Sequence, residues 1–448
     1  MGRIVFVEKS PKELIAFNKD TLDFYVVEPI VKDIYGSILS DGVEVAREKY
    51  NVSKEDLDSI CELVCEDEDP LVFREEQPEQ QKRITLDRLV LNVTNVCNLK
   101  CAYCYACGGS YQSEEGIMKM EVAKKAVDVF CDFFDSIRIL QFFGGEPLIN
   151  LEVIAGVCEY FLEKKENGEI ENVPSFGVCT NGTLLTTEAI DLIEKYGLNV
   201  TVSLDGDQYI HDLNRYDNNG NGTYNRIISN IKELYKRTKQ PTTIEVTYNQ
   251  KHVENGISIK DIANHFQPMF PETSFHIVPV STAVESLQLK DRSAFVQSVD
   301  DIFGSLESDG AYTYSLVQRL IDALRHKQYS DYICPAGLGT LSVDIHGNIY
   351  PCFMFTDVEH LNMGSIFEEN IFQSEKMREI RTLFLERAKA KDEKCNDCML
   401  QRFCCGCHGM NYYQNDSIAN YEEGFCQMNI QMAEKVLIDL ADYVNSLS

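Results

Sequence analysis

Three cysteines in one short segment form the clearest chemical pattern in this chain. Cys97, Cys101 and Cys104 have the spacing C-x3-C-x2-C and directly follow a segment that predicts a strand. Three thiolates on one loop can hold three irons of a cubane cluster and leave the fourth iron without a protein ligand. Zinc is an alternative, because Cys107 could supply the fourth ligand that a closed zinc site requires.

A second group of cysteines lies within residues 326–448, whereas none lies between Cys179 and Cys334. Its members are Cys334, Cys352, Cys395, Cys398, Cys404, Cys405, Cys407 and Cys426. This clustering favours two separate metal regions over a random scatter of small apolar residues. The region is otherwise rich in loops until a closing helix expected over 427–447, so metal would help to hold it together. Structural zinc knuckles are an alternative here too, since C-x2-C pairs recur in zinc ribbons.

Compartment and charge restrict the function. No apolar run reaches the roughly 20 residues of a membrane-spanning helix, and the first residues lack the apolar stretch of a signal peptide. We therefore expect a cytoplasmic protein, in which the 17 cysteines stay reduced and do not build a disulfide framework. The 71 acidic and 42 basic residues give a net charge of −29, which argues against nucleic acid or an anionic membrane as a partner.

The elements that must position the first cysteines are predicted between residues 85 and 325. Short β-branched or aromatic runs alternate there with amphipathic stretches, which predicts a parallel sheet covered by helices, either open or part of a barrel. The expected strands are Leu89 to Thr94, Arg138 to Phe143, Ser175 to Thr180, Asn199 to Leu204, Thr243 to Tyr248 and Phe275 to Val280. Helical patterns between them include Lys119 to Phe134, Leu151 to Lys165 and Thr187 to Tyr196. The active site of such a fold lies at the C-terminal ends of the strands.

Residues 1–69 predict a small separate module. Two short strands, Gly2 to Glu8 and Leu22 to Val27, are followed by three short helical patterns, an arrangement typical of a winged helix. The acidic stretch over 70–84, rich in Pro and Gln, predicts a linker to the following domain.

The cysteine loop, with Tyr103 just before its third cysteine, resembles the signature of the radical S-adenosylmethionine (SAM) enzymes. The resemblance implies that Cys97, Cys101 and Cys104 hold a four-iron, four-sulfur cluster whose open iron binds SAM. It also implies a partial (β/α)6 TIM-like barrel over residues 85–325. In this family an electron from the cluster cleaves SAM, and the resulting deoxyadenosyl radical removes hydrogen from unactivated carbon.

The segments that follow the predicted strands are similar to the SAM-binding segments of the family. Gly144 to Pro147 resembles the family segment that binds the methionine amino group. Its two glycines allow close backbone approach, and Glu146 can pair with the methionine ammonium. Asn181-Gly182 and Ser203 to Gly206 match strand ends that line the SAM ribose and the substrate space. His211 is expected to be structural. The resemblance thus predicts these cofactor-binding residues: Tyr103, Gly144, Gly145, Glu146, Pro147, Ser203 and Asp205.

The second cysteine group resembles the SPASM extension of these enzymes, in which seven cysteines ligate two auxiliary clusters. The match gives one cluster to Cys395, Cys398, Cys404 and Cys426 and the other to Cys334, Cys352 and Cys407. Cys407 lies one residue closer to Cys404 than the family spacing requires, so Cys405 could replace Cys404 as a ligand. A three-cysteine cluster leaves an iron that can take the thiolate of a substrate.

The expected reaction follows from two further resemblances. Residues 1–69 resemble the leader-peptide recognition element of ribosomal peptide maturation, which pairs an exposed strand with an extended leader. The segment His408 to Tyr413 resembles maturases of six-cysteine and related thioether peptides. These resemblances imply an enzyme that joins a cysteine sulfur to a carbon of a precursor peptide, with SAM and three four-iron, four-sulfur clusters as cofactors. An electron donor such as ferredoxin or flavodoxin is then expected as a partner.

Three alternatives remain at this point. Carbon–carbon cross-linking of a peptide and formylglycine formation in sulfatases use the same radical chemistry, and a zinc scaffold that binds peptides would use none. Sulfatase-maturing members place an acidic base directly after the second SPASM cysteine, whereas Phe353 follows Cys352 here, which disfavours formylglycine formation.

Overall fold

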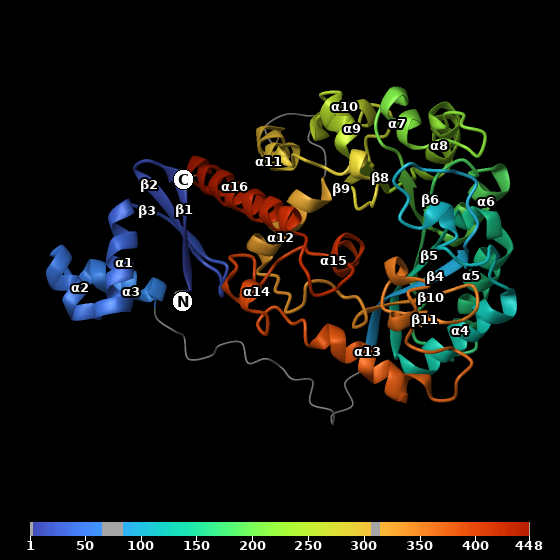
Figure 1. The fold of residues 1–448 in the computed structure, drawn as a ribbon, viewed down its shortest axis with the longest axis horizontal. Helices are drawn as coiled ribbons and strands as arrows, with labels where there is room; N and C mark the ends of the chain where they lie inside the picture. Colours follow the sequence, from blue (N-terminus) through green and yellow to red (C-terminus); the bar gives the residue numbers. More distant parts are fainter. Residues whose placement is uncertain (1–2, 65–83, 306–313, 448) are drawn as a thin grey trace.

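The computed structural model describes residues 3–64, 84–305 and 314–447. Figure 1 shows a small N-terminal module at one end of the long axis and a sheet covered by helices at the other, with the C-terminal third between them. Almost all of the predicted linker over 70–84 lies outside the described residues.

The N-terminal module consists of a three-stranded antiparallel sheet followed by three helices. The strands, in the sheet order β1-β2-β3, are β1 (Ile4–Ser10), β2 (Glu13–Asn18) and β3 (Phe24–Val27). The helices are α1 (Pro29–Asp41), α2 (Val43–Tyr50) and α3 (Lys54–Val64). The sequence did not predict β2, because Ile15, Ala16 and Phe17 are all buried and therefore lack the alternation that marks a half-exposed strand.

Six parallel strands form the centre of the larger sheet, as the sequence predicted, and they are paired in chain order. They are β4 (Thr85–Thr94), β5 (Ser136–Gly144), β6 (Ser175–Thr180), β7 (Asn199–Ser203), β8 (Thr243–Tyr248) and β9 (Ser274–Pro279). The helices between and beside them are α4 (Met120–Phe133), α5 (Leu151–Glu166), α6 (Thr187–Tyr196), α7 (Gln208–Asn214), α8 (Tyr224–Thr238), α9 (Gln250–Glu254) and α10 (Ile259–Phe266).

The C-terminal third extends this sheet. The strand β10 (Thr340–Val343) pairs in parallel with β4, and β11 (Ile349–Tyr350) pairs antiparallel with β10, so the sheet has eight strands in the order β11-β10-β4-β5-β6-β7-β8-β9. Strands of four and two residues are too short to give a sequence pattern, and these two were not predicted. The remaining helices are α11 (Ser293–Ser305), α12 (Ser315–His326), α13 (Glu375–Leu385), α14 (Glu393–Asp397), α15 (His408–Asn415) and α16 (Glu423–Leu447).

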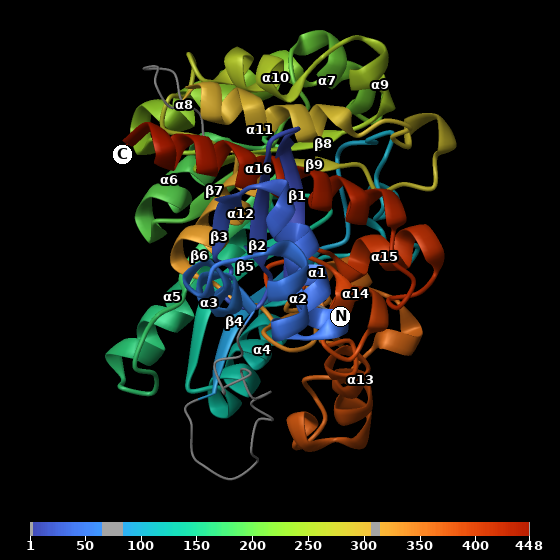
Figure 2. The same ribbon diagram turned by 90° about the vertical axis from the view of Figure 1, so that its left-hand side faces the viewer.

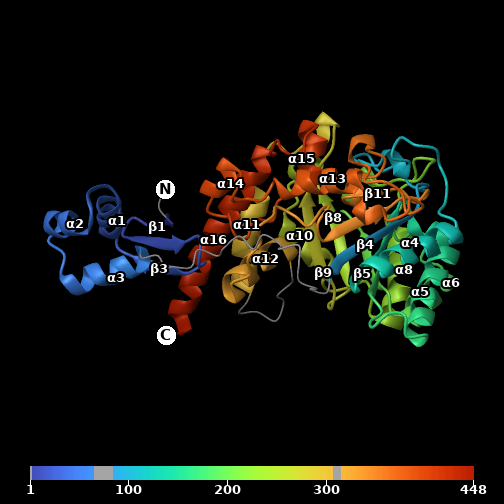
Figure 3. The same cartoon turned by 90° about the horizontal axis from the view of Figure 1, so that it is seen from below.

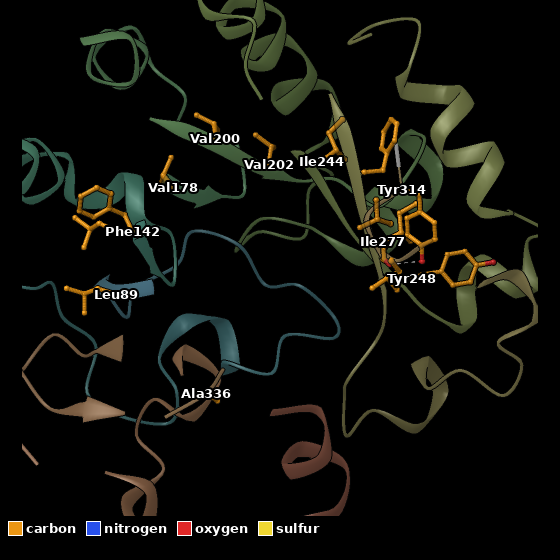
Figure 4. Close-up of a cluster of buried hydrophobic side chains, with 14 of the residues drawn as sticks. Leu89, Phe142, Val178, Val200, Val202, Ile244, Tyr248, Ile277, Tyr314 and Ala336 are labelled. Carbon is orange, nitrogen blue, oxygen red and sulfur yellow. Dashed lines mark hydrogen bonds between the residues drawn. The ribbon is translucent and has the colours of Figure 1, made fainter. Parts of the chain in front are cut away.

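Alternate residues of the parallel strands form the core. Phe142, Val178, Val202 and Ile244 are completely buried, and each such side chain contributes roughly 1.5–3 kcal/mol through the hydrophobic effect. Figure 4 shows these residues together with Tyr314, whose hydroxyl donates to the Ile277 carbonyl at 3.0 Å. Because side chains alternate along a strand, the residues between them face the other side of the sheet.

The N-terminal module docks on the C-terminal third through its sheet (Figures 2 and 3). Phe17 of β2 packs edge-on against Phe403 with ring centroids 6.0 Å apart. Lys9 pairs with Asp442 of α16 at 2.9 Å, and Lys19 donates to the Asn396 carbonyl at 2.7 Å. Among the described residues, no helix is both long enough and apolar enough to cross a membrane.

Candidate active site

The two glycines after β5 allow its end to lie directly against the cysteine loop. A Cβ on Gly144, whose φ is +137°, would lie 2.0 Å from the Thr94 carbonyl oxygen. A Cβ on Gly145 would lie 2.3 Å from the Val96 carbonyl oxygen. Any side chain at either position would collide with the backbone that leads into Cys97, so these glycines set the position of the loop.

Hydrogen bonds hold the cysteine loop in place from three directions. The Asn181 amide donates to the Asn98 side chain at 2.9 Å, while the Lys100 and Ala102 N–H groups donate to the carbonyls of Tyr216 and Asn214. N–H groups also donate to the sulfurs. The bonds run from Leu99 to Cys97 at 3.5 Å and from Gly108 to Cys104 at 3.3 Å. Such bonds favour the thiolate form and tune any cluster that the sulfurs bind.

The three loop thiols lie close together in a water-poor place. Burial, together with the nearby Glu146 and the other two thiols, raises the pKa of Cys97 to about 12. Burial likewise raises the pKa of Cys101 to about 11, and Arg215 opposes that rise. Without a metal the Cys97 and Cys101 thiols stay protonated, and a bound cluster would displace their protons.

Glu146 fastens β5 to the end of β6. Its buried carboxylate accepts hydrogen bonds from the Leu148 N–H at 3.0 Å, the Thr180 hydroxyl at 2.7 Å and the Asn181 N–H at 2.7 Å. Burial raises the pKa of Glu146, and these three donors lower it. The predicted pairing with a ligand ammonium would have to compete with these donors. Pro147 is buried and begins the short helical turn that follows.

Tyr103 links the loop to Asp205, which lies in the segment after β7. The Tyr103 hydroxyl donates to the Asp205 carboxylate at 2.7 Å and accepts from Arg215 at 2.8 Å. Burial raises the pKa of Asp205, whereas Arg215 and His252 lower it. His211, predicted to be structural, is fully buried and accepts from the Asp205 N–H at 3.3 Å. Ser203 lines the adjacent cavity.

A cavity of about 550 Å³ connects the loop with the C-terminal third. The cysteines that line it are Cys97, Cys101, Cys104, Cys179, Cys334, Cys352, Cys405 and Cys407. Gly144, Gly145, Asn181 and Ser203 line the same space, so the predicted residues at four strand ends do meet at one site.

The C-terminal cysteines lie in two spatial groups, and their assignment as cluster ligands stays a prediction. Cys334, Cys352 and Cys407 lie at the cavity, where burial and the nearby Cys407 raise the pKa of Cys334 and of Cys352 to about 12. Cys395, Cys398, Cys404 and Cys426 form the other set. Cys404 lies near Cys398, whereas Cys405 faces the cavity. Among the described residues, no three His, Cys, Asp or Glu side chains converge as ligands of a single metal ion.

A buried lysine beside the four-cysteine set tests whether these residues fit an iron–sulfur cluster. Lys389 is 1% exposed, and its ammonium has no hydrogen-bond partner among the described residues. Burial lowers the pKa of Lys389, whereas the nearby Cys404, Cys405, Asp331 and Cys395 favour its protonated form. Asp331 makes its ion pair with Arg402 at 3.2 Å and not with Lys389. A buried charge without a paired counter-charge is costly, and an anionic cluster held by the four thiolates would supply one. The four-cysteine set and Lys389 therefore fit an iron–sulfur cluster.

Several charged residues of the cavity were not predicted from the sequence. Arg88, Glu245 and His276 lie on the inner face of the sheet, and Arg215 and Arg319 line the same cavity from helices and loops. The sequence does contain a signal for two of them, because Glu245 and His276 alternate with the buried apolar residues of their strands.

Comparisons with known proteins agree with this geometry. Residues 91–254 match the family model of the radical SAM superfamily, and residues 334–399 match the model of SPASM, an iron–sulfur cluster-binding domain. The chain is 24% identical over 81% of its length to a cysteine-type anaerobic sulfatase-maturating enzyme of Clostridium novyi, of which it covers 98%. It is 22% identical over 73% of its length to the subtilosin biosynthesis protein AlbA of Bacillus subtilis, of which it covers 69%.

Two solved structures share the fold. Native anSMEcpe with bound AdoMet aligns with 81% of this chain and 99% of its own, with a TM-score of 0.65 and 20% identity. Streptococcus suis SuiB bound to the precursor peptide SuiA aligns with 95% of this chain and 98% of its own, with a TM-score of 0.55 and 16% identity.

The radical SAM domain binds SAM and a four-iron, four-sulfur cluster, and the SPASM domain binds auxiliary iron–sulfur clusters. The thiol sets around the cavity and the two family matches together identify this protein as a radical SAM enzyme with a SPASM domain.

Proposed function

We propose that this enzyme modifies a ribosomally made, cysteine-containing precursor peptide by joining a cysteine sulfur to a carbon of the same peptide. The observation that carries the proposal is the single cavity that both Cys97 to Cys104 and the set Cys334, Cys352 and Cys407 line. A peptide in this space would lie between the site of radical formation and a three-cysteine set with an open ligand position. The sequence similarity to AlbA, a protein of bacteriocin subtilosin biosynthesis, supports a peptide substrate.

In the proposed assignment Cys97, Cys101 and Cys104 hold the first cluster, and Tyr103, Gly144 to Pro147, Ser203 and Asp205 surround SAM. When bound, SAM and this cluster supply the radical that removes a hydrogen atom from carbon. Cys334, Cys352 and Cys407 hold one auxiliary cluster, and the four-cysteine set holds the other. Since Cys404 lies beside Cys398, we assign Cys404 rather than Cys405 to that set.

The surrounding residues orient the peptide and exclude water. The buried Asp205–Tyr103–Arg215 chain and the glycine contacts hold the loop rigidly against the sheet. Forming the bond removes one hydrogen from sulfur and one from carbon. One hydrogen atom leaves with the deoxyadenosyl group, and the other leaves as a proton and an electron that passes to a ferredoxin- or flavodoxin-type carrier.

The N-terminal module is proposed to bind the leader of the precursor. β3 is at the edge of its sheet, and Tyr25 and Val26 on it are 51% and 36% exposed. An extended peptide can add to such an edge through main-chain hydrogen bonds. The fold shared with SuiB, whose structure contains a precursor peptide, supports this role.

The test is to incubate reconstituted, reduced enzyme with SAM and a candidate precursor and to measure peptide mass and deoxyadenosine. We expect each bond to lower the peptide mass by two hydrogens. Cys97→Ala should abolish SAM cleavage, and Cys352→Ala should retain part of it but make no product. Cys131→Ala, which alters a cysteine outside both sets on α4, is the matched control. Unchanged peptide and SAM cleavage that does not respond to peptide would refute the proposal.

Formylglycine formation is the second candidate, because the sulfatase-maturating relative aligns with 81% of this chain. Against it, Phe353 occupies the position after Cys352 and packs on Phe143 with ring centroids 4.3 Å apart, so no carboxylate is available there. A synthetic peptide with a sulfatase-type cysteine motif separates the two, since an aldehyde product would favour this candidate over thioether formation.

A further inference from the structure

Two arginines in the central cavity make no ion pair with any of the described residues. Arg88 on β4 and Arg319 on α12 both line the space between the two thiol sets and remain accessible to solvent. Among the described residues, neither side chain makes a hydrogen bond or an ion pair, although the whole chain carries 71 acidic residues. Arg138, on the neighbouring strand β5, also lines the cavity, but it pairs with Asp87 at 3.3 Å.

These guanidinium groups lie near enough to repel each other. Burial and the like charges of Arg138 and Arg319 lower the pKa of Arg88, while Asp87 and the Cys352 thiol favour its charged form. Burial likewise lowers the pKa of the adjacent His276; Glu245 opposes this fall, and Arg319 and Arg88 add to it. Glu245 is the other carboxylate that lines the cavity, and it accepts a hydrogen bond from the Cys179 thiol at 3.4 Å. Neither carboxylate forms an ion pair with Arg88 or Arg319 among the described residues, so these two guanidinium groups have no directly bound anion.

We propose that Arg88 and Arg319 form a carboxylate-binding subsite for the peptide substrate, which places an acidic side chain of the peptide beside the reacting cysteine. This inference rests on the proposed function. Guanidinium groups bind carboxylates through paired, charge-assisted hydrogen bonds. In a chain with a net charge of −29, this local positive charge would also draw an acidic segment past an otherwise repulsive surface.

The test measures binding, so it does not depend on turnover. Calorimetry with the reconstituted holoenzyme compares acetyl-Gly-Cys-Gly-Asp-Gly-amide, its Asn counterpart, and the Asn counterpart with a free C-terminal carboxylate. We expect the Asp peptide to bind about tenfold more tightly than the Asn amide, equivalent to about 1.4 kcal/mol. A preference for the free C-terminus instead would identify a terminal carboxylate as the ligand group.

Arg88→Gln and Arg319→Gln should each abolish the preference, whereas Arg138→Gln, whose charge already has a partner in Asp87, should keep it. A wild-type enzyme that does not distinguish the peptides overturns the subsite. The subsite is also overturned if Arg88→Gln and Arg319→Gln both keep the preference for the Asp peptide and change only the reduction potentials of the clusters. The arginines would then act on the clusters and not on the peptide. If the wild-type enzyme prefers the Asp peptide but modifies no precursor peptide, the carboxylate subsite stands and only the proposed function is overturned.

A second inference rests on Lys389, the buried ammonium that makes no hydrogen bond within the described part of the chain. Lys19 and Lys394 also lie near Cys398, but Lys19 donates to the Asn396 carbonyl and Lys394 pairs with Glu423. We infer that Lys389 raises the reduction potential of the cluster at the four-cysteine set. A fixed positive charge stabilises the reduced form, which carries one more negative charge.

The potential is measured by redox titration of the holoenzyme with electron paramagnetic resonance detection. Lys389→Met should lower the potential of that cluster by at least about 59 mV, a tenfold change for one electron. Lys389→Arg should not, and Lys394→Met should shift it less because Glu423 already balances that charge. An unchanged potential in a loaded Lys389→Met enzyme overturns the inference. If Lys389→Met fails to load, retention of iron by Lys389→Arg supports the need for charge, and loss of iron in both variants overturns it.

Discussion

Individual side chains around the cysteine loop act through contacts that tolerate little change. The Tyr103 hydroxyl stands between a buried carboxylate and a buried guanidinium, so it mediates the contact between Asp205 and Arg215. Burial strongly raises the pKa of Tyr103, which keeps its hydroxyl protonated and able to donate. The side chain predicted to bind cofactor therefore also holds the site together.

Tyr103→Phe should lower the free energy of unfolding of the metal-free protein by about 1–3 kcal/mol, because two buried charged groups each lose a hydrogen-bond partner. Urea-induced unfolding measures this. A stability equal to that of the wild type would show that water or a rearranged Arg215 replaces the hydroxyl.

Gly145→Ala should prevent the cysteine loop from adopting its position, because the added Cβ would lie 2.3 Å from the Val96 carbonyl oxygen and 3.0 Å from the Cys97 nitrogen. We expect loss of the iron that the first cluster contributes, measured as iron and sulfide per chain after reconstitution. Gly36→Ala on α1, where nothing lies within 4 Å, is the control and should load normally. Full loading of Gly145→Ala would mean that the backbone moves aside freely.

At the scale of elements, the short helix α7 after β7 holds the Asp205 backbone in place through His211. Its His211 accepts from the Asp205 N–H and contacts the Thr223 hydroxyl at 3.0 Å through its other ring nitrogen. Burial and the nearby Arg215 lower the pKa of His211 well below its ordinary value. The native state therefore holds this imidazole neutral.

This arrangement predicts acid sensitivity. As the pH falls below about 6.5, the unfolded chain binds a proton at His211 that the native protein does not, so stability falls by up to about 1.4 kcal/mol per pH unit. The loss continues until the pH reaches the lowered native pKa. His211→Gln should make the slope of unfolding free energy against pH shallower between pH values of about 6.5 and 5. An identical slope in the variant would exclude His211 as a source.

At the scale of the whole molecule, the buried residues of the N-terminal module fall into three clusters, one of which joins Ile4 and Ala16 of its sheet to Tyr35 of α1. Its helices bury Ile34, Ile38 and Leu57 in a cluster of their own, whereas Ile15 and Phe17 of its sheet join the core of the main body. One face of the module's sheet is thus held by docking on the main body and the other by α1, and the docking fixes where the leader of the proposed precursor would enter.

Phe17→Ala should loosen the module, because Phe17 is fully buried and packs against Phe403. A substitution of this kind typically costs about 3–5 kcal/mol. Hydrogen exchange of the β1 to β3 amides should rise strongly, while that of β5 to β8 should not. Leu39→Ala, at a side chain 54% exposed, is the control and should leave exchange unchanged. Uniform exchange throughout Phe17→Ala would indicate general unfolding instead of release of the module.

The sequence by itself determined those features of the fold and site that depend on residues close together in the chain. The spacing of Cys97, Cys101 and Cys104, the six strands of the parallel sheet and the motifs at their ends are local patterns, and the fold class was correct. It also predicted the two C-terminal cysteine sets, although through a family resemblance. The strand β2 was missed because its buried run lacks alternation.

Only the tertiary structure decided what lies across the cavity. The pairing of β10 with β4 joins residues about 250 positions apart, and it brings Cys334 and Cys352 to the cavity beside Cys97. The meeting of Arg88 with Arg319, and of Lys389 with the four-cysteine set, likewise depends on how distant segments pack. Such contacts leave no periodic trace in the sequence, because their partners are set by the closure of the whole chain and not by neighbours along it.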